Sequence, residues 1–288
     1  MAQPVTVKSI EPITQLQQGE FFHPVVGPGG QILFTGAAYT GLYMLDKQGK
    51  ITTLSQQTGS GYEPLFSADG NYVYFRPYEY DGLRKLSSLV KRSLTGNEET
   101  ILIENERDFT SPRKLANGNI AVSRNNELQI VDESLADINN KSPQKSVFIE
   151  KGRIALYVNG QKNILSPVGD GFYLWPSLSP DGSKLLFTKV GQGTFISTLS
   201  GDIISELGYA NAPQWSPDGN WVVFMRDIDD GHRLIDSDIF ISSADGTSTF
   251  PLTETSDLKE VYPSWVVPTE IVFGSDSGII YKALLEIK

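Results

Sequence analysis

The chain has 288 residues, of which 39% are hydrophobic and 10% aromatic, and it carries a formal net charge of −10. This composition excludes a globally disordered chain, and the acidic charge disfavours a nucleic-acid partner because it repels phosphate groups. The sequence has no cysteine, which excludes disulfides, thiolate metal sites and a cysteine nucleophile.

The first residues, Met1–Pro4, lack the basic and apolar segments of a signal peptide. No apolar stretch reaches the roughly 18 residues of a transmembrane helix, so none is expected. A mature exported protein given a new start methionine would begin in the same way, which makes export a hypothesis. The segment Val5–Leu16 follows with partly alternating apolar residues and is predicted to form a strand.

One unit then recurs along the chain: a proline, a turn that usually contains glycine, and an apolar run. The six copies start at Pro24, Pro64, Pro112, Pro176, Pro213 and Pro263 and end at Phe34, Phe75, Val122, Phe187, Phe224 and Phe273. Pairs such as Asp181-Gly182 and Asp218-Gly219 lie between short apolar runs. These pairs predict β-hairpins in which both central turn residues take positive φ.

A second hairpin follows most copies, so each repeat has four strands. The clearest example joins Ser237–Ile241 to Phe250–Thr253 through Asp245-Gly246. Four-stranded units that recur about every 40 residues are typical of the blades of a β-propeller. The sequence therefore predicts one all-β domain over residues 1–288, built of four-stranded antiparallel blades.

The expected number of blades is six. Residues 111–174 are interpreted as one irregular or expanded blade, with the polar segment Glu133–Lys145 as an inserted loop. Seven blades, with a degenerate fourth blade, is the alternative. Only three strands fit after Pro263, so residues 5–16 are expected to complete the C-terminal blade and close the ring.

The repeats resemble those of the TolB-like, WD40-like propeller family. Trp175–Gly182 and Pro213–Gly219 are similar to its P-x-[WF]-S-P-D-G core, and Ser237–Ile241 with Ala244–Gly246 is similar to its second hairpin. The sequence departs from the pattern at Pro28–Gly30 and Val267–Thr269, so the loops there are expected to differ in shape from those of the family. The resemblance implies a propeller, and such propellers serve as protein-docking platforms of the bacterial envelope, as gating domains of peptidases, and as lyases.

The sequence carries no catalytic constellation. There is no α/β-hydrolase segment with a Gly-x-Ser-x-Gly elbow. The acidic stretch Asp227–Gly231 does not meet EF-hand spacing and is interpreted as a solvated hairpin loop. His23 and Glu63 are the only plausible pair for a metal-assisted enzyme. No catalytic residue, metal ligand or cofactor is therefore assigned.

A binding site is predicted at one end of the channel. The residues directly before the six prolines, among them Ala212, should encircle that end, and other polar or aromatic residues lie just upstream. The predicted ligand-binding residues are His23, Tyr62, Glu63, Ser111, Tyr173, Trp175, Asn211, Glu260 and Tyr262.

These observations favour a non-enzymatic binding or scaffold protein of the bacterial cell envelope, periplasmic or extracellular (secreted). Its expected partner is a protein, peptide or glycan held at the channel mouth, with no nucleic acid and no transmembrane segment. The alternative is a small-molecule enzyme, such as a metal-assisted carbohydrate lyase or hydrolase that uses the same mouth.

Overall fold

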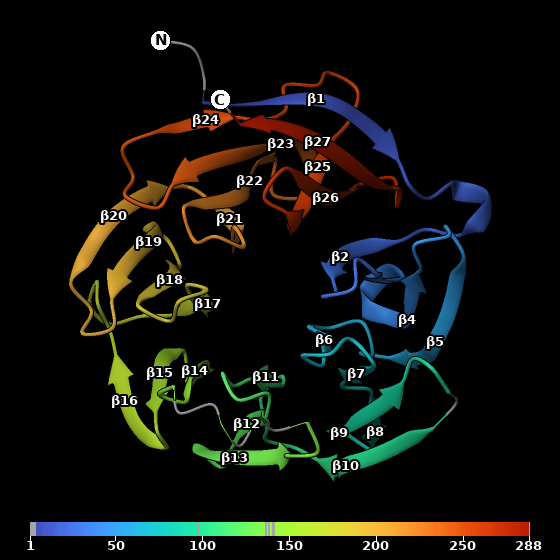
Figure 1. Ribbon diagram of the computed structural model, residues 1–288, viewed down its shortest axis with the longest axis vertical. Helices are drawn as coiled ribbons and strands as arrows, with labels where there is room; N and C mark the ends of the chain where they lie inside the picture. The colour runs from blue at the N-terminus through green and yellow to red at the C-terminus, as the bar shows by residue number, and fades with distance from the viewer. Residues whose placement is uncertain (1–3, 97, 136, 138, 140–141, 288) are drawn as a thin grey trace. The chain divides into compact units, whose positions relative to one another are not determined.

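The computed structural model describes residues 4–96, 98–135, 137, 139 and 142–287. Their regular secondary structure is β-strand, apart from the short 3-10 helices η1 (Leu16–Gln18) and η2 (Ala37–Tyr39) (Figure 1). None of the helices within the described residues has the length and apolar character needed to cross a membrane.

The described strands form seven antiparallel sheets, and four of these sheets have four strands each. Three of these sheets are each built from four strands that are consecutive along the chain. The first holds β2 (Phe22–Val26), β3 (Ile32–Thr35), β4 (Thr40–Leu45) and β5 (Ile51–Thr58). The next two hold β17 (Tyr173–Leu178), β18 (Lys184–Lys189), β19 (Gly193–Thr198) and β20 (Ile203–Gly208), and then β21 (Asn211–Trp215), β22 (Trp221–Asp229), β23 (Leu234–Ser243) and β24 (Thr249–Pro251).

The remaining sheets vary in strand number. One sheet has the order β10-β9-β7-β6, with β8 also paired to β9; its strands are β6 (Leu65–Phe66), β7 (Tyr72–Phe75), β8 (Tyr78–Asp81), β9 (Arg84–Ser93) and β10 (Glu99–Glu106). Two sheets have three strands, namely β11 (Arg113–Lys114), β12 (Ile120–Arg124) and β13 (Glu127–Asp132), and then β14 (Lys145–Glu150), β15 (Arg153–Val158) and β16 (Gln161–Leu165). Sheets repeated in this way along the chain are the blades of a β-propeller.

The prediction of six blades is wrong, and the alternative of seven is confirmed. Residues 111–174 do not form one expanded blade, because they contain two separate three-stranded sheets and the start of β17. The physical reason is that β14 begins at Lys145 without the proline that marks the other repeats. The segment Glu133–Lys145 leads from β13 to β14, and its residues 136, 138 and 140–141 lie outside the described part of the chain.

The chain is organised in two compact units, each described here by itself. One unit lies within Met1–Pro24 and Leu165–Lys288, and the other within Val25–Ile164. The second unit has its own apolar core around Leu33, Val73 and Phe75, each at most 1% exposed.

The two ends of the chain share one sheet within the first unit. The last sheet has the order β1-β27-β26-β25, with β1 (Val5–Pro12), β25 (Glu260–Val267), β26 (Glu270–Ser275) and β27 (Ile280–Ile287) (Figure 1). The strand β1 runs antiparallel to β27, from the pair Val5 with Ile287 to the pair Pro12 with Tyr281. The predicted N-terminal strand therefore completes the C-terminal blade, although it ends at Pro12 and Leu16 lies in η1.

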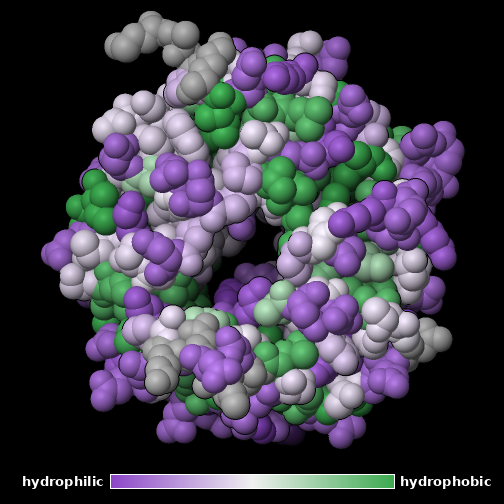
Figure 2. All heavy atoms as spheres, in the orientation of Figure 1, coloured by the Kyte–Doolittle hydropathy of each residue, from purple (hydrophilic) through white to green (hydrophobic). Residues whose placement is uncertain are grey.

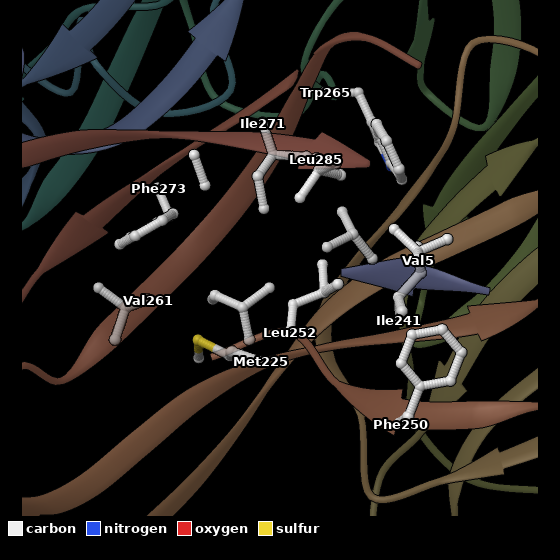
Figure 3. Close-up of a cluster of buried hydrophobic side chains, with 13 residues drawn as sticks. Val5, Met225, Ile241, Phe250, Leu252, Val261, Trp265, Ile271, Phe273 and Leu285 are labelled. Atoms are coloured by element: carbon white, nitrogen blue, oxygen red, sulfur yellow. The ribbon is translucent and has the colours of Figure 1, made fainter. Parts of the chain in front are cut away.

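The core of the first unit joins side chains of this last sheet to those of the sheet before it. Val5 is 1% exposed and packs in the same cluster as Ile241, Trp265 and Leu285 (Figure 3). Because β1 supplies one of these buried side chains, the strand contributes apolar burial as well as backbone hydrogen bonds.

The Pro-Asp-Gly turns form in a different way from the one expected. The amide of Gly219 donates to the carbonyl of Ser216 at 2.9 Å, which closes a turn over Ser216–Gly219. Proline then stands second and glycine fourth, the positions that these residues favour in a type I turn. Gly219 has a φ of 71°, whereas Asp218 is not among the residues with positive φ. Instead, the Asp218 carboxylate accepts hydrogen bonds from the Ser216 hydroxyl and the Asn220 amide.

Candidate functional site

Five of the six residues that precede the repeat prolines have a left-handed backbone. Their φ angles lie between 47° and 53°, and they are His23, Glu63, Trp175, Ala212 and Tyr262. In β17, β21 and β25 the pairing with the next strand skips this residue and its proline, which marks a bulge. Proline has no N–H to donate to the ladder, so it is tolerated at a bulge. The bulge breaks the strand's alternation and redirects the side chain before the proline.

Within the first unit, two of these side chains lie against each other. The ring centroids of His23 and Tyr262 are 3.9 Å apart, with an interplanar angle of 52°. Burial lowers the pKa of His23 from 6.5 to about 4, so the imidazole is neutral at pH 7. His23 and Glu63, the pair considered for a metal, belong to different units.

The other predicted residues of the first unit differ in how far they reach solvent. Trp175 is partly exposed, whereas Tyr173 is buried, and its hydroxyl donates to the Gly169 carbonyl at 2.7 Å. The side-chain amide of Asn211 donates to Asp227 at 2.7 Å. Glu260 is fully buried.

A pocket of about 470 Å³ opens beside Tyr262 in this unit. Its walls come from the first residue of β2, from β22, the hairpin loop after it, β23 and β25, and from the end of β26 with the residue after it. The lining residues are Phe22, Met225, Asp227, Asp229, Gly231, His232, Arg233, Leu234, Val261, Tyr262, Ser275 and Asp276. Apolar and aromatic side chains therefore share the lining with several charged ones, Arg233 and the aspartates among them.

The pocket has an acidic side. Asp227 accepts hydrogen bonds from two neutral groups, the Asn211 amide and the Tyr209 hydroxyl at 3.2 Å. Burial raises the pKa of Tyr262, and the negative charge of Asp227 raises it further. Among the described residues, neither Asp227 nor Asp229 has an ion-pair partner, while Asp276 pairs with Lys259 at 2.9 Å. Asp227 and Tyr262 therefore lie near each other in the lining of one pocket.

The second unit brings Tyr62, Glu63 and Ser111 together. The Arg113 guanidinium lies 3.2 Å from the Glu63 carboxylate, and Ser111 also hydrogen-bonds Glu63. Although burial acts in the opposite direction, Arg113, Ser111 and Arg76 lower the pKa of Glu63 below its usual value. The three predicted residues thus belong to one hydrogen-bonded and charged cluster.

The sequence analysis did not assign to a site the charged residues of the pocket beside Tyr262 or those of the cluster around Glu63. Asp227 and Asp229 were expected in a solvated loop, but they line the pocket. Arg76 and Arg113 follow apolar or proline residues that marked strands, and nothing in the repeat pattern distinguished them. Within the described ranges, no group of three or more His, Asp or Glu residues is arranged to hold a metal ion.

Comparisons with known proteins identify the fold. No family model and no curated protein matches the sequence. Among solved structures, the chain is similar to virginiamycin B lyase from Staphylococcus aureus, with 15% identity, coverage of 97% of this chain and 99% of that one, and a TM-score of 0.65. A streptogramin B lyase gives 16% identity, coverage of 97% and 98%, and a TM-score of 0.66. A chain of a mitotic checkpoint complex gives 7% identity, coverage of 99% and 96%, and a TM-score of 0.65.

These identities are low, and the likeness shows the fold alone. The chain is an all-β propeller protein with antiparallel blades, most of them four-stranded.

Proposed function

We propose that this chain is a TolB-like propeller that binds a peptide or protein partner by taking a basic side chain into the pocket beside Tyr262. One observation carries the proposal: Asp227, which has no ion-pair partner among the described residues, lines a cavity of about 470 Å³ together with Tyr262. A lysine or arginine could place its charge near Asp227 and its methylene groups against Phe22 and Met225. The Pro-Asp-Gly repeats support the TolB-like assignment, and with it a periplasmic or extracellular location.

Binding of short blocked peptides would test this proposal. A peptide with a central lysine or arginine should bind more tightly than the same peptide with glutamine. Asp227→Asn should weaken that binding about ten-fold or more, because a charged hydrogen bond contributes roughly 1.5–3 kcal/mol. Glu206→Gln is the matched control, since it removes one exposed charge from β20 of the same unit. Equal affinity for the basic and the neutral peptide would contradict the proposal.

The alternative function is a small-molecule enzyme, and the lyases among the proteins of similar fold favour it. His23 would be its central group, because a neutral imidazole can accept a proton or bind a metal. Incubation with acidic oligosaccharides and with virginiamycin B, followed by product analysis, separates the two functions. If the unaltered chain converts one of these compounds and His23→Asn abolishes that turnover, the protein is an enzyme and the binding proposal is wrong.

A further inference from the structure

Basic side chains gather around a single carboxylate within the unit Val25–Ile164. Burial lowers the pKa of Arg76, and the positive charge of nearby Arg113 lowers it further. Burial and the positive charge of Arg76 likewise lower the pKa of Lys85, so these cations lie near one another. Among the described groups that interact there, Glu63 is the only carboxylate. Three cations and one anion leave excess positive charge at this place, although the whole chain carries −10.

The packing around Arg76 fixes its guanidinium. Its Nη1 donates to the Phe109 carbonyl, and its guanidinium carbon lies 5.4 Å from the Phe109 ring centroid and 5.9 Å from the Tyr62 ring centroid. A guanidinium has five N–H donors, so the bond to Phe109 leaves most of them for other acceptors. Because aromatic contacts hold the side chain in place, little further ordering is needed when it binds an acceptor.

Arg113 is positioned by different contacts. It donates to Glu63 and to the Pro112 carbonyl, each at 3.2 Å. Its side chain is 31% exposed, and the Glu63 side chain beside it is 37% exposed. Solvent, and therefore a small ion, can reach the pair.

We propose that Arg76 and Arg113 form a second binding site, which takes the oxyanion group of a small ligand, a carboxylate or a phosphate. The guanidinium fork matches both groups in geometry and charge. Glu63 occupies part of the same donor set and so competes with the ligand. This site lies in the other unit from the pocket of the proposed function, and neither depends on the other.

Calorimetric titration at low ionic strength tests the site, with inorganic phosphate and succinate as separate probes. At least one probe should bind, and the tighter one identifies the preferred oxyanion. Arg113→Gln should weaken its affinity about ten-fold or more, since it removes charge-assisted hydrogen bonds. Glu63→Gln should strengthen it, because the internal competitor is lost. A gain in affinity cannot arise from misfolding, so this variant keeps the test decisive.

Two exposed residues of the same unit give matched controls. Arg153→Gln on β15 and Glu127→Gln on β13 change the net charge by the same amounts and should leave the affinity unchanged. Failure of both probes to bind the unaltered chain would overturn the site. So would Arg113→Gln and Glu63→Gln variants that shift the affinity in the same direction or not at all.

Discussion

The hydroxyl of Thr255 donates to Oε1 of Glu260 at 2.9 Å, while Oε2 of the same carboxyl group is buried without a hydrogen-bond partner. Glu260 is 0% exposed, and burial raises its pKa from 4.5 to about 7. The nearby charges of Asp238 and Asp236 on β23 raise the pKa in the same direction. A carboxyl group in these surroundings is more stable when protonated.

The first prediction is that Glu260 makes folding less favourable as the pH rises. Between about pH 4.5 and pH 7 the folded state binds more protons than the unfolded state, so the free energy of unfolding falls as the pH increases. The shift corresponds to at most about 3 kcal/mol. Glu260→Gln should remove this pH dependence. The free energy of unfolding of the variant, relative to that of the unaltered chain, should therefore be higher at pH 8 than at pH 5.

Urea unfolding at the two pH values measures this difference. Glu206→Gln removes an exposed carboxylate of the same unit and should show no such gain. If the difference between Glu260→Gln and the unaltered chain is the same at pH 5 and pH 8, the carboxyl is ionised in the folded protein throughout.

The second prediction concerns His23 and has the opposite sign. Its folded pKa of about 4 lies below the usual value of 6.5, so the unfolded state binds more protons between these limits. Stability from this residue is therefore present above about pH 6.5 and is lost as the pH falls toward 4. His23→Asn should show a smaller loss of stability between pH 7 and pH 4.5 than the unaltered chain.

Asparagine is chosen at position 23 because it tolerates the left-handed backbone found there. The lost contact with Tyr262 should lower stability by a similar amount at every pH, so the comparison rests on the slope of stability against pH. His232→Asn, an exposed position in the hairpin loop, serves as the control. A slope that His23→Asn leaves unaltered would contradict the burial of a neutral imidazole.

The third prediction tests the sheet that joins the chain ends. Val5→Ala should cost about 2 kcal/mol, because Val5 is 1% exposed in the core cluster and its truncation leaves a cavity. Removal of residues 1–12 should cost more, since β27 then loses its partner strand and becomes an open edge. Lys8→Ala should change stability by less than about 0.5 kcal/mol, because its pair with Glu286 is exposed. Thermal unfolding and light scattering would measure both stability and aggregation; a truncated chain that melts at the original temperature would contradict the pairing.

Much of the fold was predictable because its signals are local. The prolines at the repeats and the Asp-Gly pairs mark hairpins, and the three strands after Pro263 implied that β1 would complete their sheet. The seventh blade was missed because β14 carries no such mark. The left-handed residues were also missed, since a residue before proline ordinarily prefers an extended backbone. Only the strand pairing, which skips these positions, shows why that preference is overridden.

The charged groups of the candidate sites depend on contacts that local patterns do not contain. Arg76 meets Phe109, 33 positions further along the chain, and Arg113 meets Glu63 across 50 positions. On the surface, polar and apolar residues are interspersed over the face shown in Figure 2, and no apolar patch alone distinguishes a site there. The sequence could therefore indicate the residues before the prolines as candidate site residues. It could not indicate Asp227, Arg76 or Arg113, the charged residues on which the two proposed sites depend.

The last prediction tests the left-handed backbone directly, with two alanines of similar burial. Ala212 has a φ of 47° and is 8% exposed, whereas Ala210 is 1% exposed and is not among the residues with positive φ. Glycine should cost about 1–2 kcal/mol at position 210, through the lost methyl burial and the greater freedom of the unfolded chain. At position 212 those losses are offset by about 1 kcal/mol, because glycine adopts positive φ without steric strain. Ala212→Gly should therefore be at least about 1 kcal/mol less destabilising than Ala210→Gly in urea unfolding.

Ala212→Val should be the most destabilising of the three, since a β-branched side chain is the least tolerant of this conformation. Equal losses for the two glycine variants would mean that Ala212 has an ordinary strand backbone in solution.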